Sequence, residues 1–211
     1  MFARTERLLL RPGWVEDAAL LAATIANPAI VRNLATAPWP YGEAEATAFL
    51  TDLMAQSHAA NLPNFLIFLR THAEPRLIGG CGLAQTADGD IEMGYWIAPS
   101  HWGLGFAHEA GRALVQIARD GLRLKTLHAG HFTDNPASGK VLRKLGFVPT
   151  GRIVERQSMA RRGAVACVDY ALDLTAAAHR DDGGDVHSTK PDGPRAMPPA
   201  MPATMRDQMA A

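Results

Sequence analysis

The stretch His101-Trp-Gly-Leu-Gly-Phe-Ala-His-Glu-Ala110 joins a predicted strand, residues 90–97, to a predicted helix, residues 105–122, whose apolar side chains recur at helical spacing. Gly103 and Gly105 allow the backbone to turn tightly and to approach a ligand without a Cβ in the way. The free N–H groups at the start of the helix, together with the helix dipole, favour an anion there. These residues alone leave two interpretations open, a phosphate-binding site and an ordinary turn between a strand and a helix.

Two well-known nucleotide-binding motifs do not fit this stretch. No Lys-Ser/Thr pair follows Gly105, so the loop is not a P-loop. The Rossmann pattern Gly-x-Gly-x-x-Gly is not met either. The strand before the stretch follows Asp88-Gly89, a hairpin signal typical of antiparallel pairing. The sequence therefore disfavours a nucleotide-binding α/β protein.

The composition is that of one globular domain, with or without a tail. Of the 211 residues, 47% are hydrophobic, which is enough for a substantial core. The 21 basic and 21 acidic residues cancel, which argues against a broad nucleic-acid or membrane footprint. No secretory signal or membrane-spanning run is visible, and Cys81 and Cys167 lie in apolar runs without Cys-x-x-Cys spacing. We therefore expect a cytoplasmic protein that binds neither nucleic acid nor a membrane.

Around the central stretch, hydrophobic periodicity and turn residues predict strands and helices in a definite order. Asp134 or Asn135 can cap the helix after the strand 125–132, with Pro136 at its first position and Gly146 after its end. The predicted strands are residues 8–12, 64–70, 77–84, 90–97, 125–132, 147–157 and 165–174, and the predicted helices are residues 17–26, 29–34, 43–56, 105–122 and 136–145.

The composition changes near residue 176. The acidic run Asp181–Asp185 and the Pro-Met-Ala-rich end lack apolar periodicity. We predict a folded domain over residues 1–175 and a disordered tail over residues 176–211, with a short terminal helix as the weaker alternative.

Three motifs in this order resemble the GNAT (Gcn5-related) N-acetyltransferase superfamily. They are Glu6-Arg-Leu-Leu-Leu-Arg-Pro12, the run from Ile91 to Ala110, and Asp134-Asn-Pro-Ala-Ser-Gly-Lys-Val-Leu-Arg-Lys-Leu-Gly-Phe147. The resemblance covers residues 4–174 and is to the branch that includes ribosomal-protein N-terminal acetyltransferases (RimJ/RimL-like). It implies an α+β fold, the GNAT acyl-CoA N-acyltransferase fold, in which helices flank a central, mostly antiparallel, twisted sheet.

The resemblance also implies acetyl-CoA as the acetyl donor. The phosphate-loop pattern of the family aligns onto Trp102–Ala107, although Trp102 stands where this branch often has Arg or Gln. Because backbone N–H groups bind the pyrophosphate, that change leaves the site in place. The strands 91–97 and 125–132 are expected to splay so that pantetheine enters between them. The donor contacts implied are Ile97, Leu104, Gly105, Ala107, His108 and Asn135.

Two residues are the candidates for the chemistry of acetyl transfer. Glu92 is the candidate base. The alternatives are that it orients the substrate ammonium or that it is only a solvated residue of its strand. Ser138 is the candidate proton donor to the leaving sulfur, although it could also only hydrogen-bond the thiol or cap its helix. Many relatives use a tyrosine one helical turn later, where Leu142 stands. Tyr95 and Trp96 alternate along the strand, so one should face the core and the other the slot.

The acceptor is expected to be a primary amine, either a protein N-terminus or a small molecule such as an amino acid, a polyamine or an aminoglycoside. By resemblance, Trp39 and Tyr41 would form part of its pocket, with a packed surface loop as the alternative. His131 is interpreted as structural, and the scattered histidines indicate no metal site. The competing hypothesis is a non-catalytic acyl-CoA sensor or interaction domain of the same fold. A homodimer through the late strands is left open.

Overall fold

The computed structural model describes residues 1–60 and 62–175 of the 211-residue chain. The tail predicted to be disordered, residues 176–211, lies outside the described residues, so this prediction and the domain boundary beside it stay predictions. Among the helices of the described part, none is long and apolar enough to cross a membrane.

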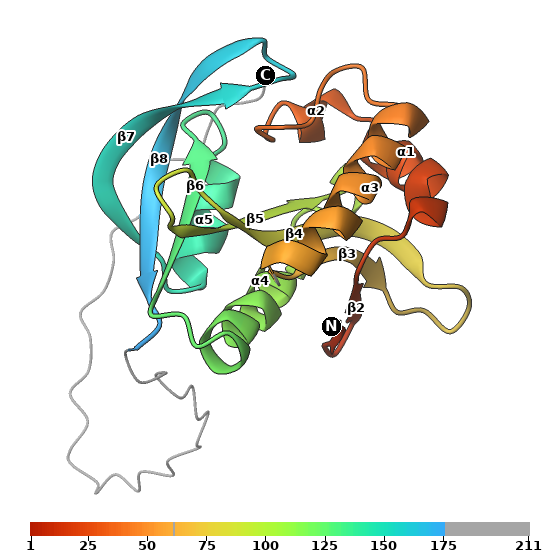
Figure 1. Cartoon of the computed structure of the whole chain (residues 1–211), viewed down its shortest axis with the longest axis horizontal. Coiled ribbons are helices and arrows are strands. Elements are labelled where there is room, and N and C mark those ends of the chain that lie inside the picture. The colour runs from red at the N-terminus through yellow and green to blue at the C-terminus, as the bar shows by residue number, and fades with distance from the viewer. Residues whose placement is uncertain (61, 176–211) are drawn as a thin grey trace, which may run out of the picture. The chain divides into compact units, whose positions relative to one another are not determined.

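The predicted α+β fold is confirmed, with flanking helices around one mixed, mostly antiparallel sheet of eight strands in the order β1-β2-β3-β4-β5-β6-β8-β7 (Figure 1). Neighbouring strands pair antiparallel except β5 and β6, which are parallel. Only the two-residue strand β1 was not predicted. The strands are β1 (Ala3–Arg4), β2 (Leu8–Arg11), β3 (Asn64–Leu69), β4 (Arg76–Gln85), β5 (Ile91–Ile97), β6 (Thr126–Phe132), β7 (Val148–Ser158) and β8 (Gly163–Asp173).

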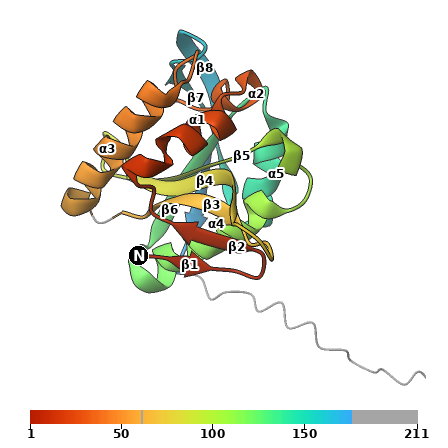
Figure 2. The ribbon, with the colours of Figure 1, turned by 90° about the vertical axis from the view of Figure 1, so that its right-hand side faces the viewer.

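Helices cover both faces of the sheet. Figure 2 shows α1 and α3 on one face and α4 on the opposite one. The predicted helix 105–122 is α4 followed by a π-helical turn, η3, and the predicted helix 43–56 continues to residue 60. The helices are η1 (Val15–Asp17), α1 (Ala18–Ile25), α2 (Pro28–Val31), α3 (Glu43–Ala60), η2 (Pro99–His101), α4 (Phe106–Gln116), η3 (Ile117–Gly121) and α5 (Pro136–Lys144).

Over the described residues, a hydrophobic core lies on each face of the sheet, and the strand β3 contributes to both. Its side chains alternate, so that Phe65 and Ile67 enter the core under α4, whereas Leu66 and Phe68 enter the core under α1 and α3. A strand buried on both faces has to be apolar at nearly every position, and β3 is.

The strands β5 and β6 part soon after they meet. Glu92 pairs with His128 and Met93 with Ala129, and over the described residues no further pairs join these two strands. The divergence, which the resemblance implied, opens the middle of the sheet on the carboxyl side of Met93.

Candidate active site

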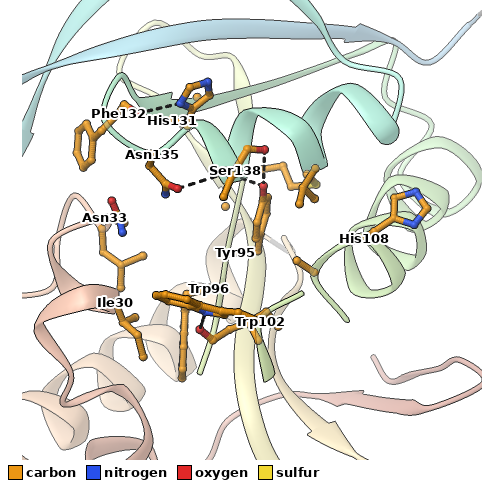
Figure 3. A pocket seen from close by; sticks show the side chains of 18 of the residues that line it. Ile30, Asn33, Tyr95, Trp96, Trp102, His108, His131, Phe132, Asn135 and Ser138 are labelled. Carbon is orange, nitrogen blue, oxygen red and sulfur yellow. Dashed lines mark hydrogen bonds between the residues drawn. The ribbon is translucent and has the colours of Figure 1, made fainter. Parts of the chain in front are cut away.

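A cavity of about 500 Å³ lies where β5 and β6 diverge. Its lining comes from α2 and the loop after it, from β5, from the loop before α4 and its first turn, and from the end of β6 with the start of α5. Figure 3 shows Asn33, Trp102 and Ser138 around this space, each from a different part of the chain. The central stretch of the sequence thus forms one wall of a cavity in the opened sheet.

The loop before α4 has the geometry of an anion site. Gly103 and Gly105 have positive φ angles of 75° and 83°. A Cβ at Gly103 would meet nothing within 4 Å, so the backbone angle rather than crowding requires glycine there. Gly105 is the N-cap of α4 and no side chain caps that helix, so the first N–H groups have no partner within it. They are available to a phosphate at the cavity wall.

The N-terminal motif holds this loop in place. The Arg7 guanidinium lies 2.7 Å from the Glu109 carboxylate, donates to the Leu104 carbonyl at 3.0 Å and stacks 4.4 Å from the centre of the Phe106 ring. Burial works against the charge of Glu109, but hydrogen bonds from Thr5 and Arg7 outweigh it and lower the pKa of this carboxyl. Sequence reasoning missed the contact, because Arg7 and Glu109 are 102 residues apart and local patterns carry no information on such a pair.

Most of the predicted donor contacts line the cavity. They are Ile97, Gly105, Ala107, His108 and Asn135. Leu104 does not line it: its side chain is exposed, and its carbonyl accepts from Arg7. The indole N–H of Trp102 donates to the Ile97 carbonyl at 2.6 Å, so the unusual tryptophan of the loop is tied to the end of β5.

Glu92 lines the cavity in an ion pair. Both of its carboxylate oxygens accept from Nη1 of Arg156, which β7 supplies, and Nη2 of Arg156 lies 3.7 Å from Asp169. Burial opposes the charge of Arg156, but the hydrogen bond and charge of Glu92, with the charges of Cys167 and Asp169, raise the pKa of Arg156. Arg156 was missed in the sequence because its partner lies 64 residues away. Because a carboxylate has about four lone-pair sites, Glu92 can still accept a proton while it is paired with Arg156.

Ser138 lies at the first turn of α5, and its hydroxyl is 2.7 Å from the hydroxyl of Tyr95. The helix cap is Asn135, whose side chain accepts from the Ser138 N–H at 3.4 Å, so Ser138 is not the cap. Burial raises the pKa of Tyr95 to about 12, against the hydrogen bond with Ser138, which lowers it. Trp96 also lines the cavity, so the expected division between one core-facing and one slot-facing aromatic is wrong.

His131 has partners for both ring nitrogens. Nδ1 lies 2.8 Å from the Phe132 carbonyl and Nε2 lies 3.4 Å from the hydroxyl of Tyr170. The ring also packs where a Cβ on Gly139 would stand, at 2.5 Å from Nε2. His131 also lines the cavity, so its structural interpretation stays a prediction.

Comparison with known proteins decides the family. A family model described as an acetyltransferase (GNAT) domain matches residues 7–148. The chain belongs to the GNAT acetyltransferase family. It is 30% identical over 151 residues to the uncharacterized N-acetyltransferase p20 of Bacillus licheniformis, which covers 70% of this chain and 82% of that protein. It is 32% identical over 161 residues to the uncharacterized N-acetyltransferase YoaA of Bacillus subtilis (strain 168), with coverages of 75% and 88%.

The fold of this GNAT acetyltransferase also matches solved structures. A RimL ribosomal L7/L12 alpha-N-protein acetyltransferase in complex with coenzyme A superposes with a TM-score of 0.70. The match covers 84% of this chain and 100% of the other at 19% identity, so the fold is what the two share. The chain is an acetyl-CoA-dependent N-acetyltransferase, and the free N–H groups at α4 beside the opened sheet fit that donor.

The predicted acceptor residues of this GNAT enzyme lie elsewhere. Neither Trp39 nor Tyr41 lines the cavity. Tyr41 is buried in the core under α1 and α3, and burial, with a smaller contribution from the charge of Glu45, raises its pKa to about 12. Trp39 is 42% exposed. The alternative, a packed surface loop, describes both residues, because an aromatic beside proline can serve either purpose and only tertiary packing decides.

Residues 29–35, which are α2 and the loop after it, line the cavity instead. The segment contributes Ala29, Ile30, Asn33, Leu34 and Ala35. The turn between β7 and β8 holds this segment, since Ser158 donates to the Leu34 carbonyl at 3.1 Å and the Met159 N–H donates to the Ala35 carbonyl at 2.9 Å.

Asp134 connects that turn to α2 through ion pairs. Its carboxylate accepts two hydrogen bonds from Arg161, at 2.8 and 2.9 Å, and one from Arg32 at 2.7 Å. These ion pairs join the β7–β8 turn, α2 and the loop before α5.

Proposed function

We propose that this enzyme transfers the acetyl group of acetyl-CoA directly to a primary amine while both substrates are bound. The observation that carries the proposal is that one cavity runs from the free N-terminus of α4 to the Glu92–Arg156 pair. A phosphate-bearing donor and an amine can therefore meet in the opened sheet without a covalent enzyme intermediate.

The donor binds through the backbone of the loop and the first turn of α4. Gly105, Ala107 and His108 supply N–H groups to the pyrophosphate, and Leu104 contributes only its backbone. Ile97 and Asn135 flank the arm that enters between β5 and β6. Acetyl-CoA supplies an acetyl group on a thioester, which an amine can displace.

Transfer then requires a neutral amine and a stabilised leaving sulfur. The nitrogen forms a bond to the acetyl carbon, the carbon–sulfur bond breaks, and sulfur takes the electron pair. The proton of the amine passes to Glu92, directly or through water, and the Ser138 hydroxyl donates a hydrogen bond to the sulfur, which leaves as a thiolate. An α-amine, with a reference pKa of about 7.7–8.0, needs less help than a lysine at about 10.4, so a weak base suffices.

A protein N-terminus is the acceptor proposed first, and a small-molecule amine is the alternative. The side chain of Asn33 lines the cavity; its amide nitrogen donates to the Ala29 carbonyl at 2.9 Å, and its oxygen can accept from a peptide N–H. The RimL structure, whose fold this chain shares, is that of a ribosomal L7/L12 alpha-N-protein acetyltransferase. A cytoplasmic location remains part of the proposal.

The test is thiol release from acetyl-CoA with a panel of short peptides, amino acids, polyamines and aminoglycosides. We expect release with one class of amine and a loss of rate in Glu92→Gln that is larger at low pH. Glu155→Gln, an exposed carboxylate next to Arg156 on β7, is the matched control and should keep the wild-type rate. Binding of acetyl-CoA without release by any amine would instead favour the sensor hypothesis, for which the occupied carboxylate of Glu92 is the supporting observation.

A further inference from the structure

Two hydroxyl groups in the cavity wall lie within hydrogen-bond distance of each other. Among the described residues that line it, Tyr95 and Ser138 carry the only hydroxyls. They come from different elements, β5 and α5, and their oxygens are 2.7 Å apart. Figure 3 shows Tyr95 reaching Ser138 between His108 on one side and Asn33 on the other.

Leu142, one helical turn after Ser138, cannot contribute to this pair. Its side chain is 1% exposed in the core under α4 and does not line the cavity. On this turn of α5, a hydrogen bond into the cavity can therefore come from the hydroxyl of Ser138, and its direction depends on the group that the hydroxyl is bonded to.

The two hydroxyls can share their hydrogens in two ways. Tyr95 has one hydrogen to donate, and it lies 2.7 Å from the Ser138 hydroxyl and 3.1 Å from the Ser138 carbonyl. If Tyr95 donates to the carbonyl, the serine hydrogen is spent on the phenol oxygen. If Tyr95 donates to the serine hydroxyl, the serine hydrogen is free to point into the cavity.

We propose that Tyr95 is a positioning residue that donates to the Ser138 hydroxyl and thereby directs the serine hydrogen at the leaving sulfur. This inference rests on the proposed function, because the sulfur must lie beside Ser138. No proton leaves Tyr95: the carbon–sulfur electron pair moves to sulfur, and the serine O–H stabilises the charge that forms there. Negative charge on sulfur selects this arrangement, since a hydrogen bond to a charged partner is stronger than one between neutral groups.

Burial keeps the Tyr95 phenol protonated, so that it can donate a hydrogen bond throughout the reaction. The raised pKa of Tyr95, about 12, keeps its phenol protonated at neutral pH. A phenol this weakly acidic would not protonate a thiolate readily, so orienting the serine is the role that remains.

The first test measures the pKa of the thiol of coenzyme A, without an acetyl group, while it is bound to the protein. The titration is monitored by the ultraviolet absorbance of the thiolate. We expect Tyr95→Phe to raise the pKa of the bound thiol by about one unit, a tenfold weaker acid. Ser138→Ala should raise it at least as much, and the double variant should show no further change. An unchanged thiol pKa in Tyr95→Phe with coenzyme A bound would overturn the inference.

The second test is turnover of acetyl-CoA with glycinamide, a small mimic of a peptide N-terminus. Tyr95→Phe should lower kcat about tenfold and leave KM for acetyl-CoA within twofold. Tyr170→Phe is the matched control, because this buried hydroxyl bonds Arg143 and His131 but does not line the cavity, and it should keep kcat within twofold. Equal losses of kcat in the two variants would overturn the specific role of Tyr95.

The two tests separate the inference from the proposed function. If coenzyme A does not bind at all, the proposed donor site is wrong and the inference falls with it. If coenzyme A binds but glycinamide is not acetylated, the thiol titration still decides the role of Tyr95.

Discussion

Replacing Arg7 with alanine should weaken donor binding, although this side chain does not line the cavity. The change removes the hydrogen bond to the Leu104 carbonyl, worth about 1 kcal/mol for the loop conformation. It also leaves the Glu109 charge uncompensated in the first turn of α4. At about 10 Å and a dielectric constant of about 80, Glu109 repels each phosphate charge by roughly 0.4 kcal/mol, or about 0.8 kcal/mol for two.

Together these losses amount to about 1 to 2 kcal/mol, so calorimetry should show coenzyme A binding about five- to thirtyfold more weakly. The electrostatic share should vanish in 1 M salt, where the Debye length is about 3 Å, and in the double variant Arg7→Ala/Glu109→Gln. Arg4→Ala, an exposed arginine three residues earlier, should bind coenzyme A like the wild type. A folded Arg7→Ala protein with wild-type affinity at low salt would refute the claim that the N-terminal motif holds the loop.

Three further changes test other parts of the structure. Gly105→Ala should cost about 1–2 kcal/mol in unfolding free energy and weaken coenzyme A binding, because the φ of 83° is unfavourable for a side chain with a Cβ; equal stability in urea would contradict this. Arg156→Met should lower the unfolding free energy by about 2 kcal/mol, less than a fully buried pair because both side chains keep some exposure, and adding Glu92→Gln should restore part of it. Hydrogen bonds from Arg161 lower the pKa of Asp134 from 3.8, so its contribution to stability is present above that pH and is lost as the pH falls through the folded pKa. Melting temperatures of Asp134→Asn and wild type should therefore differ at pH 7 and converge in acid.

The fold could be predicted to the level of its elements, because each depends on local pattern. The apolar run of β3 and the helical spacing after Gly105 are properties of neighbouring residues. The continuation of α3 to residue 60 was missed, although Asn61 and Pro63 are residues that often follow a helix end. The helix over residues 105–122 was predicted in extent, but not the π-helical form of its last turn, η3.

In the site, too, the features that depend on neighbouring residues could be predicted, and those that depend on distant residues could not. The phosphate loop could be predicted because backbone N–H groups form it and glycines mark it. The partners of Glu92 and Ser138 could not, since Arg156 and Tyr95 reach them across 64 and 43 residues. Tyr41 was assigned to the acceptor pocket by resemblance, but it is buried in the core under α1 and α3 and does not line the cavity.

The parting of β5 and β6 has a mechanical consequence. Over the described residues, only two pairs of the strand ladder join β1–β5 to β6, β8 and β7, although the core under α4 and the Glu92–Arg156 ion pair also cross between these halves of the sheet. The cavity lies between the two halves. Any molecule that fills it bridges both, and its binding should stiffen the whole domain and raise the melting temperature by more than the few residues it touches would suggest.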